Sequence, residues 1–228
     1  MILGMKTTIE AKRRRSSAPI FLMTSLMLLR AIIAPAPLSA QEVVYPLPTY
    51  DVNLIDRALM FSYSEPLDVA SDFTQYAAFL SPSVFALAAP IEDWLGIGAM
   101  YAGSALMSYA TRTLLKATID RDRPYMYFDD PPASRIADGD YDDSFPSGHA
   151  IMAFTGAAFT AALFKERYPD SPYRVPAVIA AYVLASATVG LRVGSGSHFL
   201  TDVAVGAAIG TFYGFIVPFA SSRLGWLD

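Results

Sequence analysis

Apolar residues gather in five long stretches of the chain. These stretches cover residues 73–91, 94–115, 150–164, 175–191 and 203–220. Ala, Gly, Leu, Phe and Met are frequent in them, and this composition favours helix over strand. Glycine and serine recur along the stretches, as close packing between membrane helices requires. The pattern predicts an all-α helical bundle with about five or six transmembrane helices.

The same pattern also fits the buried helices of a soluble bundle. A span needs about 20 apolar residues, and residues 150–164 reach that length only together with the preceding turn. The basic side chains favour spanning, because they cluster between residues 165 and 174, where one short cytoplasmic loop would lie. This orientation places residues 116–145 and 192–202 together on the outer face of the membrane.

Two different regions precede the apolar stretches. Residues 1–40 contain a basic cluster, an apolar run and small residues up to Ala40, as a secretory signal peptide does. An uncleaved first membrane helix would look similar, and either one would place the following residues outside the cytoplasm. Residues 41–72 form a polar amphipathic segment, and residues 73–228 are expected to form the main domain.

Composition narrows the possible functions. A chain of 228 residues has room for one domain or two small ones. Its hydrophobic content is 54% and its mean hydropathy +0.36, while charged residues make up 17% against about a quarter in ordinary soluble domains. The net charge of −4 offers no basic field for nucleic acid. Without cysteine there is neither thiolate catalysis nor a disulfide, and two histidines cannot form a three-histidine metal site.

Basic side chains mark the end of the second apolar stretch. Lys116 and Arg123 are seven residues apart, so a continuous helix would place them on one face, and Pro124 would then end it. Arg121 lies between them. Taken alone, the cluster also fits a surface patch in which the neighbouring aspartates neutralise the arginines.

A second cluster, Pro146-Ser147-Gly148-His149, directly precedes the third apolar stretch. Proline in a first helical turn leaves the backbone N–H groups of Ser147 and Gly148 pointing out of the helix, and such an end binds anions. His149 would then lie beside the anion and could donate a proton. A plain helix cap with an incidental histidine is the alternative.

The third cluster runs from Arg192 through a glycine-serine segment to His198 and Asp202. Four residues separate His198 from Asp202, so on a helix the carboxylate lies on the same face as the imidazole. It could hold Nδ1–H and leave Nε2 free as a nucleophile or base. A capped helix with a His/Asp surface pair is the alternative.

In order, the three clusters read Lys-x6-Arg-Pro, Pro-Ser-Gly-His and Arg-x5-His-x3-Asp. With these motifs the chain resembles the type 2 phosphatidic acid phosphatase (PAP2) superfamily, over residues 94–220. That superfamily groups membrane lipid phosphatases, soluble bacterial acid phosphatases and vanadium haloperoxidases. Residues 73–228 would be its phosphatase domain. One departure is Leu191, where the family usually has serine, and it puts one accessory hydrogen bond in doubt.

The resemblance implies two sets of site residues. Those that bind the substrate phosphate are Lys116, Arg123, Ser147, Gly148 and Arg192. The catalytic residues are His149 as general acid, His198 as the nucleophile that forms a phosphohistidine, and Asp202 as the partner that orients its ring. No metal or other cofactor is expected, because three nearby cations would oppose a divalent ion.

The leading hypothesis is therefore a membrane phosphatase for a lipid phosphate or diphosphate, in a bacterial inner membrane with its site facing the periplasm. A soluble exported acid phosphatase of broad specificity is the alternative. A vanadium haloperoxidase is disfavoured by the missing third histidine, and a non-catalytic membrane scaffold by the intact motifs. Phosphatidic acid, phosphatidylglycerol phosphate and polyprenyl diphosphate are not distinguished by the sequence.

Overall fold

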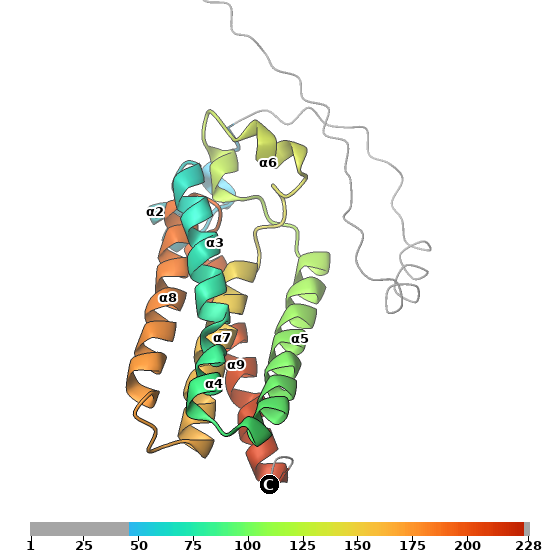
Figure 1. Cartoon of the computed structure of the whole chain (residues 1–228). Coiled ribbons are helices and arrows are strands. Elements are labelled where there is room, and N and C mark those ends of the chain that lie inside the picture. The colour runs from blue at the N-terminus through green and yellow to red at the C-terminus, as the bar shows by residue number, and fades with distance from the viewer. Residues whose placement is uncertain (1–45, 226–228) are drawn as a thin grey trace, which may run out of the picture.

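Five long helices lie side by side in the part of the chain that the computed structural model describes, residues 46–225 (Figure 1). They are α3 Glu65–Phe79, α5 Trp94–Thr118, α7 Gly148–Arg167, α8 Arg174–Gly194 and α9 Leu200–Leu224. The shorter elements are η1 Thr49–Asp51, α2 Leu54–Ala58, η2 Ser81–Val84, α4 Phe85–Ala88, η3 Ile91–Asp93, η4 Pro124–Tyr127 and α6 Ala133–Ala137. Within residues 46–225 there is no strand, so the predicted all-α bundle is confirmed. The expected signal peptide or first helix at residues 1–40 lies outside the described residues.

Four of the five apolar stretches form the expected single helices, α5, α7, α8 and α9. The first, residues 73–91, does not: α3 ends at Phe79, and η2, α4 and η3 follow as short pieces. Pro82 and Pro90 lie in this region, and proline cannot donate a helical backbone hydrogen bond. Helix α3 also begins before the stretch, at Glu65, and so runs across the expected boundary at residue 72.

Helix α7 is the centre of the bundle and packs against α3, α5, α8 and α9. Its buried side chains are mostly small, as with Ala153 and Ala157. The contact with α9 is a close backbone approach: a Cβ added at Gly210 would lie 2.3 Å from the carbonyl oxygen of Ile151. Glycine at this position therefore lets the two helix axes come together.

Within residues 46–225 two helices, α8 and α9, are long and apolar enough to cross a membrane. Only 28% of the most apolar window of each is buried inside the bundle. Large apolar side chains such as Val183 and Phe212 are exposed on them. These surfaces suggest a membrane environment, whereas the expected count of five or six spans stays a prediction.

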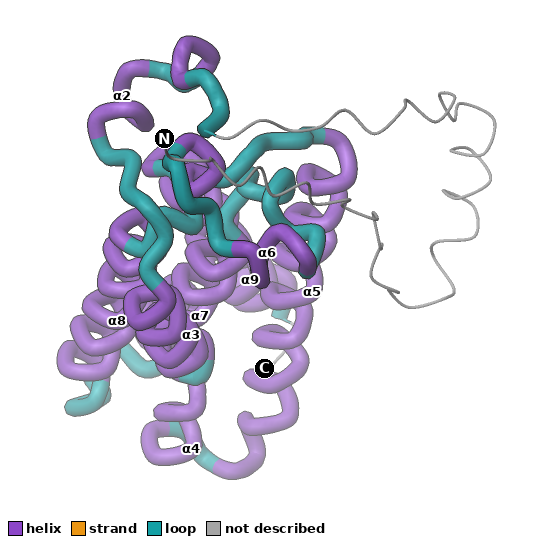
Figure 2. Tube along the Cα trace, turned by 90° about the horizontal axis from the view of Figure 1, so that it is seen from above, coloured by secondary structure: helices purple, strands orange, loops and turns teal. Residues whose placement is uncertain are grey.

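One end of the bundle collects the loops that carry the three motifs. The C-terminal ends of α5 and α8 and the N-terminal ends of α7 and α9 all lie at this end, below α6 (Figure 1). Seen from above, α6 lies over the bundle, whereas α2 lies at its edge (Figure 2). The loop between α7 and α8 lies at the opposite end (Figure 1).

Candidate active site

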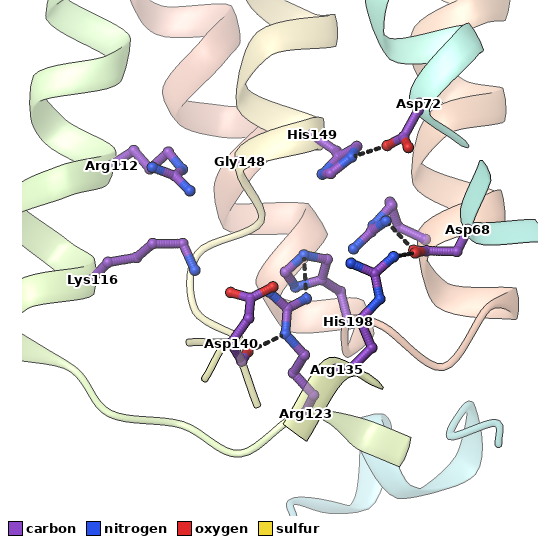
Figure 3. Close-up of a pocket in the computed structure, with 11 residues that line it drawn as sticks. Asp68, Asp72, Arg112, Lys116, Arg123, Arg135, Asp140, Gly148, His149 and His198 are labelled. Atoms are coloured by element: carbon purple, nitrogen blue, oxygen red, sulfur yellow. Dashed lines mark hydrogen bonds and ion pairs between the residues drawn. The ribbon is translucent and has the colours of Figure 1, made fainter. Parts of the chain in front are cut away.

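A small polar pocket of about 140 Å³ opens at this end of the bundle. Its lining residues are Asp68, Asp72, Arg112, Lys116, Arg123, Arg135, Asp140, Gly148, His149, Arg192 and His198 (Figure 3). Six of the eight site residues expected from the sequence are thus brought together. The other two, Ser147 and Asp202, do not line the pocket and lie behind it in the packed structure.

Lys116 and Arg123 reach the pocket from different backbone elements, so their expected position on one helix face is wrong. Helix α5 ends at Thr118, and both Ile119 and Arg123 have extended backbones. Pro124 disfavours helix at the residue before it. Arg121 N also donates to Asp142 O, at 2.9 Å, which ties this segment to the loop before α7.

The two pocket arginines of the sequence motifs, Arg123 and Arg192, are paired with carboxylates that the motifs do not include. Arg123 Nη2 donates to Asp140 Oδ2 at 2.7 Å, and Arg123 Nε donates to the Asp140 carbonyl oxygen at 2.7 Å. Arg192 Nη1 donates to Asp68 Oδ1 and, at 3.2 Å, to Ser71 Oγ. Among the described residues Arg192 Nε has no hydrogen-bond partner. The cations are therefore partly neutralised before any substrate phosphate binds.

Asp68 connects several parts of the site. Besides Arg192 it accepts hydrogen bonds from Arg135, from Ser197 Oγ at 2.8 Å and from Tyr63 Oη at 3.1 Å. Burial alone would raise the pKa of Asp68, but the Arg192 charge, the Ser197 hydroxyl and Arg135 together hold this pKa below its ordinary value. Asp68 is thus an ionised anchor for the two arginines.

His198 is buried between a guanidinium and a carboxylate. Its Nε2 lies 3.2 Å from Arg123 Nη1, and its Nδ1 lies 3.6 Å from Asp202 Oδ2. This places Asp202 on the expected side of the ring, just beyond hydrogen-bond distance, and Nδ1 has no hydrogen-bond partner among the described residues. Burial, with added repulsion from Arg123 and Arg192, lowers the pKa of His198 well below its ordinary value.

Asp202 is itself held from three sides. Ser144 Oγ donates to Oδ2 at 2.6 Å, the Phe199 N–H donates to Oδ2 at 2.9 Å, and Arg121 pairs with Oδ1. Arg121 also donates to Asp56 Oδ2, at 2.7 Å. The alternative in which the adjacent aspartates neutralise these arginines is therefore wrong, since Arg121 binds two distant carboxylates instead.

The second motif begins α7 as expected. Ser147 is the N-cap, its hydroxyl accepts from Ala150 N at 3.4 Å, and its own N–H donates to the Asp202 carbonyl oxygen at 3.1 Å. That N–H is thus used inside the protein, and only Gly148 of this turn lines the pocket. His149 Nε2 lies 2.7 Å from Asp72 Oδ1, an acidic partner from α3 that the motifs do not include.

An apolar groove of about 630 Å³ adjoins the pocket. Arg112, Gly148 and His149 line both cavities. The other groove residues come from α3, α5 and α7 and are mostly apolar: Gln75, Phe79, Ala102, Ala105, Leu106, Ser108, Tyr109, Ile151, Met152 and Thr155. Leu106 is 66% exposed, so the groove is open on its outer side. No group of three or more acidic or histidine side chains within residues 46–225 is arranged to hold a metal ion.

Clustered cations around two histidines, at the end of a helical bundle, define an anion site suited to phosphoryl transfer. A family model described as the PAP2 superfamily matches residues 97–226, so the chain belongs to this superfamily and is a phosphatase. The family prediction is thereby confirmed.

The fold has a counterpart among solved structures. The crystal structure of a transmembrane PAP2 type phosphatidylglycerolphosphate phosphatase from Bacillus subtilis aligns with 75% of this chain and 84% of that one. The TM-score is 0.50 and the sequence identity 23%, a level at which the likeness concerns the fold. No curated protein matches the chain in sequence.

Proposed function

We propose that the chain is a membrane phosphatase that hydrolyses a lipid phosphate or diphosphate monoester through a phosphohistidine, without a metal. The observation that carries this proposal is the continuity of two unlike cavities. A cationic pocket that suits a phosphate adjoins an apolar groove that suits a hydrocarbon chain, and Arg112, Gly148 and His149 line both. An amphiphile with a terminal phosphate matches both cavities at once.

In the proposed mechanism Lys116, Arg123 and Arg192 neutralise the phosphate oxygens, and Gly148 permits close approach at the start of α7. The phosphate competes with Asp140 and Asp68 for the two arginines, and a bound oxygen would also satisfy Arg192 Nε. Positioned cations of this kind stabilise the charge that spreads over the oxygens in the transition state. Ser147 contributes by capping the helix, which keeps Gly148 in place.

His198 Nε2 then attacks phosphorus, and the bond from phosphorus to the leaving oxygen breaks. His149 gives its proton to that oxygen. Burial and the Arg192 charge lower the pKa of His149 to about 4, and the hydrogen bond with Asp72 opposes this shift by favouring the imidazolium form. In the second step water attacks the phosphohistidine, His149 takes the water proton, and His198 leaves as a neutral imidazole. Asp202 faces the Nδ1 side of His198 and favours positive charge on the ring during both steps.

The proposed function also implies an orientation of the protein in the membrane. The site end of the bundle would face the periplasm and the α7–α8 loop the cytoplasm, because the basic residues 165–174 favour the inner side. The exposed apolar faces of α8 and α9 favour this reading over a soluble exported acid phosphatase. Residues 1–40 would act as a signal peptide or first membrane helix, and residues 73–228 as the phosphatase domain completed by Asp56 and Asp68.

Phosphate release from detergent-purified protein tests the proposal. Lipid phosphates and diphosphates are compared with a soluble aryl phosphate, in the presence of a chelator, with Lys165→Gln as a control that removes a cation far from the site. Wild type and Lys165→Gln should hydrolyse at least one lipid substrate and form an acid-labile phosphoenzyme, and His198→Ala should do neither. Chelator-sensitive activity, or turnover by His198→Ala, would contradict the mechanism.

A further inference from the structure

Arg112 occupies the junction between the two cavities. It lies on α5 one turn before Lys116, and it lines both the polar pocket and the apolar groove. In the close-up Arg112 and Lys116 project from α5 on the side of the pocket opposite Asp68 and Asp72 (Figure 3). None of the three sequence motifs includes Arg112.

Arg112 differs from the other pocket arginines, which are all paired with carboxylates. Arg123 is paired with Asp140, and Arg135 and Arg192 with Asp68. Within residues 46–225 no carboxylate forms an ion pair with Arg112 in the way these do, and Arg112 Cζ lies 5.8 Å from the centre of the Tyr109 ring. A guanidinium at the edge of an apolar groove therefore retains its capacity to bind an anion.

Gly148 supplies the space that this guanidinium uses. A Cβ added at Gly148 would lie 2.5 Å from Arg112 Nε and 3.4 Å from Cζ. Arg112 thus packs directly over the first residue of α7, between the expected position of the reacting phosphate and the groove. A group bound there would sit on the lipid side of the phosphate that is hydrolysed.

We propose that Arg112 binds a second phosphate group of the substrate, adjacent to the reacting one, and so selects lipids with two successive phosphates. This inference rests on the proposed function and narrows its substrate class. The guanidinium suits a phosphate because its planar N–H donors match two phosphate oxygens. Two lipids offer this chemistry: a lipid diphosphate, and a phosphate monoester joined to its tails through a phosphodiester. A lipid with a single phosphate leaves Arg112 without a partner.

Two matched substrate pairs test the inference. Farnesyl diphosphate is compared with farnesyl phosphate, and phosphatidylglycerol phosphate with phosphatidic acid, so that the tails are constant within each pair. The readout is the ratio of kcat/KM within a pair, because the amount of folded enzyme cancels in that ratio. The proteins are wild type, Arg112→Gln, Arg112→Lys, and Lys165→Gln as a control of equal charge loss far from the site.

Arg112→Gln should lower the ratio by roughly tenfold to a hundredfold in at least one pair, as expected for loss of a charged hydrogen bond. Arg112→Lys should restore part of it, and Lys165→Gln should leave it unchanged. The pair that responds identifies the source of the second phosphate. Ratios unchanged in both pairs, or an equal fall on all four substrates, would overturn the inference. If the wild type were inactive on all four substrates, the result would instead contradict the proposed function on which the inference rests.

Discussion

Arg123 and His198 meet inside the pocket, with Arg123 Nη1 3.2 Å from His198 Nε2. A guanidinium can only donate hydrogen bonds, so Nε2 is the acceptor in this contact. The neutral ring then carries its proton on Nδ1, the nitrogen that faces Asp202. The contact therefore selects the tautomer in which Nε2 holds a lone pair, as the proposed nucleophile requires.

The same burial makes the stability of the protein depend on pH through His198. Its pKa in the folded protein is well below the ordinary value because of burial and the nearby arginines, whereas in the unfolded chain it is about 6.5. Below that pH the unfolded chain binds a proton that the folded protein does not. His198 therefore disfavours the folded state progressively as the pH falls from about 6.5 towards its folded pKa, by up to about 1.4 kcal/mol per pH unit.

His198→Gln removes this titration. Thermal unfolding of wild type and His198→Gln in the same detergent, between pH 8 and pH 5, measures the effect. We expect the wild type to lose stability relative to the variant below about pH 6.5, and their difference to be constant above it. Parallel curves over the whole range would show that His198 titrates normally in the folded protein.

Packing between α7 and α9 provides a test of the fold. Gly210→Ala would place a methyl group 2.3 Å from the Ile151 carbonyl oxygen, so the two helices must separate. We expect a loss of about 1–3 kcal/mol of stability, the usual cost of overpacking. Gly190→Ala on α8 is the matched control, since nothing lies within 4 Å of its added Cβ, and it should be neutral or stabilising by up to about 1 kcal/mol.

Orientation in the membrane can be tested with single cysteines, because the chain has none of its own. Ser134 lies in α6 near the site end, and Ser171 in the loop at the other end of the bundle (Figure 1). In intact spheroplasts an impermeant maleimide should label Ser134→Cys, and should label Ser171→Cys only after lysis. Labelling of both before lysis would place both ends on the same side and contradict the membrane-spanning proposal.

Most of the fold could be predicted from the sequence, because each of the helices α5, α7, α8 and α9 corresponds to one uninterrupted apolar stretch. The interruption between α3 and α5 was harder to predict. Residues 73–91 are apolar throughout, and this composition alone does not show that the helix ends near Pro82 and Pro90. In the site, the cations and histidines could be read from local motifs. Their acidic partners could not.

Asp140 lies 17 residues after its partner Arg123, but the other acidic partners come from distant parts of the chain. Asp68 lies 124 residues before Arg192, and Asp56 lies 65 residues before Arg121. No periodicity in the sequence relates such positions, because tertiary packing of α2 and α3 against the loops creates the contacts. The clustered arginines were the available signal, because buried positive charges in an apolar chain need carboxylates nearby. The polar segment at residues 41–72 supplies two of these carboxylates, Asp56 and Asp68.

The roles of the two histidines lead to the sharpest prediction, because a general acid and a nucleophile fail differently when the leaving group changes. The alkoxide that leaves a lipid phosphate is strongly basic and needs a proton in the transition state, whereas nitrophenolate needs almost none. His149→Ala should therefore lose at least about a hundredfold in kcat on a lipid phosphate, the usual scale of general acid catalysis, and much less on nitrophenyl phosphate. His198→Ala should lose turnover of both substrates, because Nε2 is the attacking atom.

Asp202→Asn serves as the intermediate case. Its activity should fall equally on both substrates. The substitution removes the carboxylate that stabilises positive charge on the His198 ring and orients this ring, but it does not affect protonation of the leaving group. Acid-labile phosphate trapping with nitrophenyl phosphate separates the steps: His149→Ala should accumulate phosphoenzyme, because water attack on the phosphohistidine lacks its base. If His198→Ala formed the acid-labile phosphoenzyme while His149→Ala was inactive on both substrates, the two histidines would have exchanged roles.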